Sequence, residues 1–136
     1  MAIYASTALS CTIGGVDLSD HITRVSLNTS ADEIDTTAFG DSQRTLIGGL
    51  QSGSVSIDFH NDFASSEVYA TLAATGLGSA AAVVVKPNSG TTSATNPSKT
   101  ASCLITELPF LDDSVGELGT ISVTWPISGA IVTATS

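Results

Sequence analysis

Strict alternation of apolar and small polar residues is the feature that most constrains the fold. In the segment 54–60, valine, isoleucine and phenylalanine occupy every second position, and the segment 118–125 repeats the pattern up to Trp125. Successive side chains of a β-strand point to opposite faces of the sheet. The pattern therefore predicts antiparallel strands with one buried face, and it assigns Trp125 to the core and not to a binding platform.

Less regular alternation predicts the rest of the sheet structure, with strands at 8–13, 16–18, 22–29, 81–86, 99–108 and, past Pro126, 127–133. One helix is predicted, with Asn61 or Asp62 as its N-cap, Glu67 in its first turn and Gly76 just beyond its end. The expected fold is mainly β: a single domain over residues 1–136, built as a β-sandwich or partial barrel of about seven strands with one flanking α-helix.

A long polar segment at about residues 30–53 interrupts this pattern. It carries five apolar residues that water alone would not favour: Ile34, Phe39, Leu46, Ile47 and Leu50. A loop of this length in a compact domain is usually functional or disordered, and its mixed polarity suggests contact with another chain. A second polar segment, at about 88–98, is predicted to be a mobile hairpin tip.

Composition limits the classes of function. Of 136 residues, 42% are hydrophobic and 12% are charged, a globular profile. Four lysines and arginines stand against 13 acidic residues, giving a net charge of −9, which disfavours tight binding to nucleic acid. The N-terminus lacks the features of a secretory signal, and the longest apolar run is too short to span a bilayer. We expect a soluble protein that stays in the cytoplasm where it is made.

No catalytic motif is recognisable, and no cofactor or metal site is predicted. Two groups of metal-capable side chains, at 58–62 and 17–21, are interpreted as solvated strand faces and a helix cap. The pair Glu33 and Asp35 lies in the polar segment without a second element to complete a glycosidase site. Cys11 and Cys103 are interpreted as small buried hydrophobes; a disulfide between them stays open if their strands are neighbours.

Several segments, taken in order, resemble a known family. These are Asp35-Thr-Thr-Ala-Phe-Gly-Asp41, then Arg44-Thr-Leu-Ile-Gly-Gly-Leu50, the alternating strand with its short helix, and the closing Gly119-Thr-Ile-Ser-Val-Thr-Trp-Pro-Ile-Ser-Gly129. From about Val16 to Gly129, the chain resembles the major tail (tail tube) proteins of long-tailed bacteriophages. The resemblance implies a structural virion protein that forms hexameric rings, stacked into a hollow tube through which DNA is ejected.

The same resemblance implies partners and sites. The chain would bind itself, contact other tail proteins at the tube ends, and let DNA pass without specific binding; it would have no membrane anchor. It would be made in the bacterial host cytoplasm and reside in the virion tail. The inter-subunit stacking loop would use Ile34, Phe39, Arg44, Leu46 and Ile47. Carboxylates lining the lumen would repel the duplex, with Asp58, Asp112, Asp113 and Glu117 as candidates.

Two alternatives stay open. The related tube proteins of secretion systems also form stacked hexamers. A β-sandwich binding module, such as a capsid-decoration protein or an adhesin, would share the strands and the acidic composition. Clustered exposed aromatic residues would favour carbohydrate binding by such a module, but aromatics make up only 5% of the chain and most are assigned to strand cores.

Overall fold

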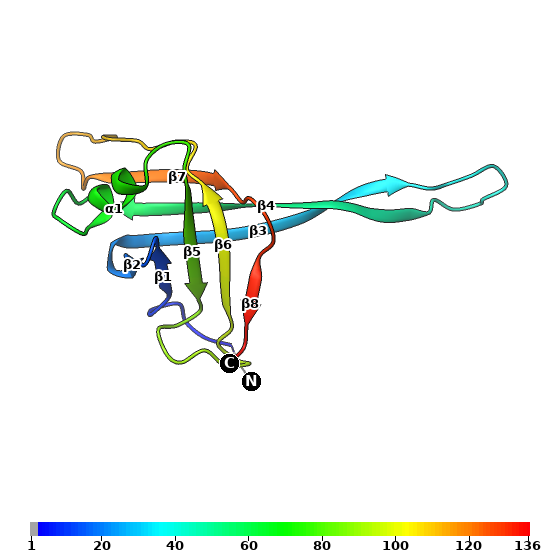
Figure 1. Cartoon of the computed structure of the whole chain (residues 1–136), viewed down its shortest axis with the longest axis horizontal. Coiled ribbons are helices and arrows are strands. Elements are labelled where there is room, and N and C mark those ends of the chain that lie inside the picture. The colour runs from blue at the N-terminus through cyan, green and yellow to red at the C-terminus, as the bar shows by residue number, and fades with distance from the viewer. Residues whose placement is uncertain (1–2) are drawn as a thin grey trace.

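Two antiparallel sheets form the body of the chain, and the strands of one run across those of the other (Figure 1). The computed structural model describes residues 3–136. The larger sheet has the order β2-β1-β5-β6-β8, with β2 at Val16–Asp17, β1 at Ser10–Ile13, β5 at Ala80–Lys86, β6 at Ser98–Leu104 and β8 at Val132–Ala134. The smaller has the order β3-β4-β7, with β3 at Ile22–Asp35, β4 at Leu46–His60 and β7 at Thr120–Pro126. A 3₁₀ turn, Ser19–His21, precedes β3, and α1 spans Val68–Thr75. The mainly β fold with one flanking α-helix is confirmed.

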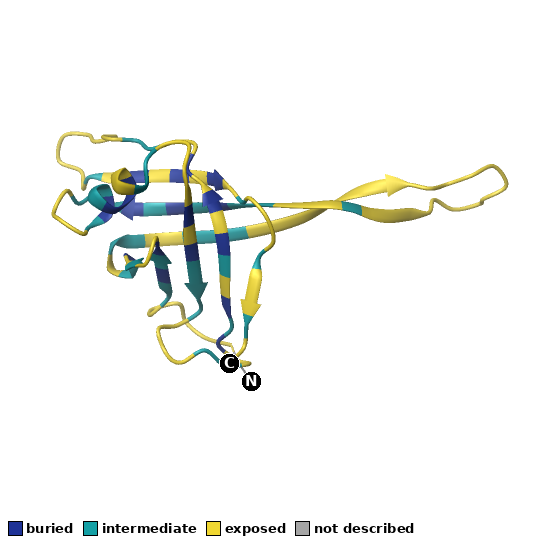
Figure 2. Cartoon of the chain, viewed as in Figure 1, coloured by how far each residue is buried: buried dark blue, intermediate teal, exposed yellow. Residues whose placement is uncertain are grey.

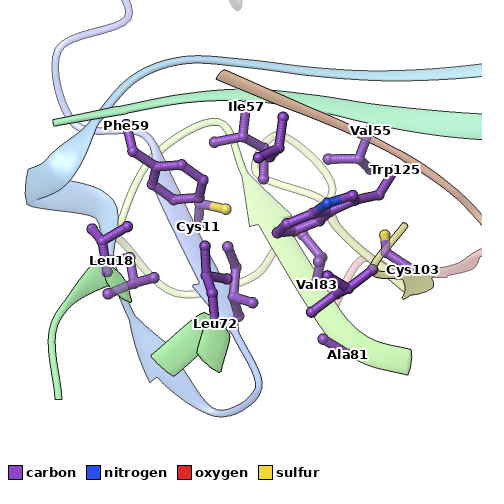
Figure 3. Close-up of a cluster of buried hydrophobic side chains, with 14 of the residues drawn as sticks. Cys11, Leu18, Val55, Ile57, Phe59, Leu72, Ala81, Val83, Cys103 and Trp125 are labelled. Carbon is purple, nitrogen blue, oxygen red and sulfur yellow. The ribbon is translucent and has the colours of Figure 1, made fainter. Parts of the chain in front are cut away.

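The core fills the space between the two sheets. Trp125 is its largest fully buried side chain, and its indole N–H donates to the carbonyl of Glu107 at 2.9 Å, so the one polar atom of the ring is satisfied. The apolar positions of β4 and β7 meet those of β1, β5 and β6, and α1 covers one end of the layer (Figure 3). The assignment of Trp125 to the core is confirmed.

Two predicted strand boundaries are wrong. Residues 105–108 lie outside β6, and the segment after Pro126 does not continue β7. Instead, β8 crosses to the other sheet and pairs with β6, where Thr100 faces Val132. Proline has no backbone N–H to donate, so the ladder of β7 ends there and the chain changes sheet.

The helix begins five or six residues later than the predicted N-cap, Asp62 or Asn61, would place it. Asp62 does cap a turn, accepting the Ala64 N–H at 2.9 Å through its side chain, but Ser66 has a positive φ of 62°. That left-handed residue interrupts helical geometry, so α1 starts at Val68, and Glu67 is its N-cap residue and not part of its first turn. The end is as predicted: Gly76, with φ 82°, donates its N–H to Leu72 at 3.0 Å.

Both cysteines are buried, as predicted, and both are free thiols. Strand β5 separates their strands, so Cys11 pairs in register with Val85 and Cys103 with Ala81. Burial, with a smaller effect of Asp17, raises the pKa of Cys11 to about 12, and burial raises the pKa of Cys103 to about 11. These thiols are therefore unreactive core residues.

The connection between β5 and β6 is organised around one side chain. Asn96 is buried, and its amide nitrogen donates to the carbonyls of Asn88, Gly90 and Thr91 at 3.2–3.3 Å. Its side-chain oxygen accepts the Asn88 N–H at 3.1 Å. The mobility predicted for this tip stays a prediction, but the loop has a defined internal hydrogen-bond network.

Candidate functional site

The segment at 30–53, which we call the arm, is a long two-stranded hairpin that projects from the body (Figure 1). Its prediction as a loop is wrong for most of its length. Strands β3 and β4 stay paired from Ser30 opposite Ser52 out to Asp35 opposite Leu46, with one irregularity near Ala31. Pairing satisfies the backbone polar groups that an irregular loop would leave to water. The irregular part is only the tip, residues 36–45.

Both faces of the arm carry aliphatic side chains. Ile34 lies opposite Ile47, and the next pair along the strands is Asp35 opposite Leu46. Directly opposed residues share a face and successive pairs alternate, so the two isoleucines occupy one face and Leu46 the other. Ile34, Ile47 and Leu46 are 46%, 55% and 52% exposed. The arm is almost entirely exposed, in contrast to the body (Figure 2).

The tip is held by its own polar groups. Arg44 Nη1 donates to Asp35 Oδ2 at 2.9 Å, and Thr37 N–H donates to Asp35 Oδ1 at 2.8 Å. The hydrogen bonds from Thr37, with a smaller effect of Arg44, lower the pKa of Asp35. Phe39 stands fully exposed at the end of the tip. Arg44 therefore pairs within its own arm, and its predicted role toward a partner stays a prediction.

A glycine marks the point where the arm leaves the body. The Gly53 carbonyl accepts the Ile127 N–H at 2.9 Å, which joins β4 to the segment that crosses between sheets. A Cβ at Gly53 would lie 2.8 Å from the carbonyl oxygen of Asn28 and 3.1 Å from a methyl group of Ile127. Glycine is thus needed here for close approach of two strands.

The four candidate lumen acids do not form one group. Asp58 lies in β4 between Arg24 and Ser122 in register. Asp112, Asp113 and Glu117 lie in the exposed connection between β6 and β7, at the end of the body opposite the arm (Figure 1). Their role in a lumen stays a prediction.

Members of the two separate groups of metal-capable side chains come together with Glu67 around His21. Its Nδ1 lies 2.8 Å from Asp20 and 3.4 Å from Glu67, and its Nε2 lies 2.8 Å from Asp62. Burial lowers the pKa of His21. The opposite effect comes from its hydrogen bonds to Asp20 and Asp62 and from the charges of Asp20 and Glu67, and because these together outweigh burial, the pKa of His21 is raised. The cluster ties the 3₁₀ turn before β3 to the segment before α1. Asp58 and His60 take no part in it.

Sequence reasoning also missed an aromatic group. Phe63, Tyr69 and Phe110 pack against one another with ring centroids 5.3–5.4 Å apart, and both phenylalanines are half-exposed. The expectation that the aromatics lie mostly in strand cores is therefore wrong: of these residue types, only Phe59 and Trp125 are fully buried among residues 3–136. No periodic signal joins residues so far apart in sequence.

No helix within residues 3–136 has both the length and the apolar character needed to cross a membrane. No protein-family model matches the sequence, and no curated protein matches it. Comparison with solved structures, in contrast, finds the same fold in large assemblies.

One similar chain belongs to the tail of an empty gene transfer agent particle with C6 symmetry, with a TM-score of 0.65 and 17% identity over 85% of this chain and 83% of that chain. A chain of the native gene transfer agent virion gives a TM-score of 0.69 and 15% identity, and the match covers 98% of this chain and 100% of that chain. A chain of the PVC sheath-tube complex of an extracellular contractile injection system, in its extended state, gives a TM-score of 0.70. Its identity is 12%, and the match covers 98% of this chain and 93% of that chain. The chain therefore has a fold that occurs in a gene transfer agent tail and in a contractile injection sheath-tube complex.

Proposed function

We propose that this chain is a structural subunit that polymerises as stacked hexameric rings into a tail tube, a conduit for DNA. The observation that carries the proposal is the arm, an exposed hairpin with aliphatic side chains on both faces. A two-stranded hairpin is marginally stable alone in water. Since this arm has aliphatic side chains on two faces, both faces are buried only if the arm lies between other subunits. The fold shared with chains of tail and sheath-tube assemblies supports this function.

The contact between copies would be head-to-tail. The arm extends from one end of an elongated molecule, so it meets a different surface on the neighbour and not another arm. Such heterologous contacts close into rings or continue as filaments, depending on the rotation between subunits. In this assembly, the net charge of −9 would disfavour adhesion of DNA to the tube.

The test replaces apolar contacts of the arm while keeping the body. Ile34→Ser with Ile47→Ser removes the aliphatic pair from one face, and Val132→Ser, which removes a somewhat more exposed aliphatic residue from β8, is the control. Negative-stain electron microscopy should show rings or tubes for the unmodified chain and for the control. The double variant should stay monomeric by light scattering, with an unchanged circular dichroism spectrum.

Two results would contradict the proposal. An unmodified chain that stays monomeric at high concentration would exclude self-assembly, and assembly of the double variant at the unmodified concentration would exclude the arm as its contact. A shorter arm, with residues 34–47 replaced by Asn-Gly between Glu33 and Gly48, repeats the test with Ile34, Leu46 and Ile47 removed together. Asn-Gly is the preferred two-residue hairpin turn.

The aromatic group favours a second candidate function, a glycan-binding module. Phe63 and Phe110 offer exposed ring surface, which sugars use for stacking. Phe110 packs edge to face against Phe63 and Tyr69, and Phe63 is tilted against Tyr69, which covers part of that surface. Binding of the monomer to a glycan array, abolished by Phe110→Ala, would support this function over the tube.

A further inference from the structure

The arm of one copy requires a receiving surface on another, and the following inference rests on the proposed function. Within the arm, four acids (Asp32, Glu33, Asp35 and Asp41) stand against Arg44, so it has three net negative charges. Because Arg44 already pairs with Asp35, the other three acids have no ion-pair partner in the arm. A matching surface should combine apolar walls with positive charge.

One groove of the body has both properties. It has a volume of about 360 Å³ and lies where β3 of the small sheet faces the ends of β5 and β6 of the large sheet. Its walls are mainly apolar, and its two charged residues are both lysines. The lining includes Val25 and Leu27 of β3, Lys86 of β5 and Lys99 of β6.

The two lysines of the groove are half of the chain's four cationic residues. Lys86 Nζ donates to the carbonyl of Gly90 at 3.0 Å, and Lys99 Nζ donates to Thr133 Oγ1 at 3.0 Å. Within residues 3–136, neither lysine forms a salt bridge. An ammonium group with three donors and only a neutral acceptor retains capacity for a carboxylate.

The groove also borders an open sheet edge. Strand β3 is at the end of the order β3-β4-β7, so among residues 3–136 no strand pairs with its outer side. Val25 and Leu27, which line the groove, belong to this strand. Unpaired edges invite a further strand, and a docked hairpin would cover this one.

Charge rules out the other exposed apolar end as the receiving surface. The aromatic group adjoins the connection between β6 and β7, which carries Glu107, Asp112, Asp113 and Glu117 and no lysine or arginine. Like charges would oppose an acidic arm there. The arm also extends away from the ends of β5 and β6 (Figure 1), where the groove lies, so a second copy must supply the contact.

We propose that the arm of one copy docks into the Lys86–Lys99 groove of a second copy. Asp32 and Glu33 meet the two lysines, and the Ile34–Ile47 pair covers the apolar wall beside the open edge of β3. Asp32 and Glu33 suit this role because both are exposed, both lie directly beside Ile34 in sequence, and neither has an ion-pair partner among the described residues. The contact is heterologous, as ring formation or stacking requires.

Charge reversal with rescue tests the proposal. Lys86→Glu with Lys99→Glu changes the net charge from −9 to −13, and Asp32→Lys with Glu33→Lys changes it to −5. The four-substitution chain returns to −9, so rescue cannot arise from net charge. Asp112→Lys with Asp113→Lys, at the opposite end, is the control that also gives −5.

The readout is the lowest concentration at which rings or tubes sediment. We expect each double reversal to raise this concentration by at least about tenfold and the four-substitution chain to return to within about threefold of the unmodified value. The control at Asp112 and Asp113 should shift less than the arm reversal does.

The possible failures are distinguishable. If the unmodified chain forms no assembly, the proposed function and this inference are both wrong. If it assembles and the lysine reversal assembles equally well, the groove alone is wrong. If both reversals block assembly and the combined chain does not recover, the pairing of Asp32 and Glu33 with these lysines is wrong.

Discussion

Strand β4 runs through two environments, the buried core of the body and the exposed arm. In the body, Val55, Ile57 and Phe59 point between the sheets and are fully buried. In the arm, Leu46 and Ile47 on the same strand are about half exposed on opposite faces. The same residue types thus stabilise the body by burial within the chain, whereas in the arm they can be buried fully only by contact with another chain. The difference teaches that the body accounts for folding and the arm for association.

The largest expected contrast compares two isoleucines of β4. Ile57→Ala should lower the free energy of unfolding by about 2–5 kcal/mol, because it leaves a cavity in the core. Ile47→Ala should change it by less than about 0.5 kcal/mol in the dispersed monomer, because that side chain contacts mainly water. Urea denaturation of both variants measures the difference.

Ile57→Val guards against outright unfolding of the alanine variant, and it should cost about 0.5–1.5 kcal/mol. A loss at Ile47 as large as that at Ile57 would show that the arm folds back on the body in solution. The separation of folding from association would then be wrong.

A smaller contrast compares two glycines, one at the base of the arm and one within it. Gly53→Ala should destabilise the monomer by about 1–3 kcal/mol, because the added Cβ would lie 2.8 Å from a backbone carbonyl that cannot easily move. Gly49→Ala meets the end of the Ile34 side chain at 3.0 Å and the Cβ of Asp32 at 3.2 Å. Exposed Ile34 can rotate away and Asp32 needs to shift by only a few tenths of an ångström, so we expect a smaller loss, below about 1 kcal/mol.

Denaturant unfolding of the two glycine variants, with amide hydrogen exchange across residues 28–53, checks this expectation. Gly53→Ala should increase exchange at the base of the arm. Equal effects at both glycines would indicate that the arm is as constrained as the body. The base of the arm would then have no special structural role.

The body could be predicted from sequence largely because period-two alternation records burial on one face. The strand from Ser54 to His60 and the core position of Trp125 follow from that pattern. The crossing of β8 to the other sheet could not be predicted, because a Pro126 break does not say which neighbour the chain joins next. The late start of α1 depends on the positive φ of Ser66, which serine rarely adopts and no propensity scale indicates.

The candidate site was predicted as a region but not as a structure. Apolar residues in a polar segment indicated a contact surface, yet the interruption of strict alternation made the segment resemble a loop. The pairing of Ile34 with Ile47 becomes visible only in the register of a hairpin. The groove joins residues from three strands and both sheets, and neither Lys86 nor Lys99 carries a local signal that places them together.

The smallest expected contrast is in pH dependence, which the body should show and the arm should not. The pKa of His21 is raised in the folded chain, so the folded state binds its proton more tightly than the unfolded state, whose histidine titrates near pH 6.5. This contribution to stability is therefore fully present below about pH 6.5 and is lost as the pH rises through the raised folded value. In the arm, the pKa of Asp35 is lowered, so this carboxyl group titrates below this range.

Unfolding by urea between pH 5.5 and 8.5 should thus show stability declining with pH in the unmodified chain. His21→Gln should flatten the decline, whereas His60→Gln, a histidine outside the cluster, should preserve it. Asp35→Asn should leave the slope unchanged, because its carboxylate is already ionised throughout. A slope that persists in His21→Gln would place the titrating group elsewhere, and one that disappears in Asp35→Asn would show that the arm, and not the body, senses pH.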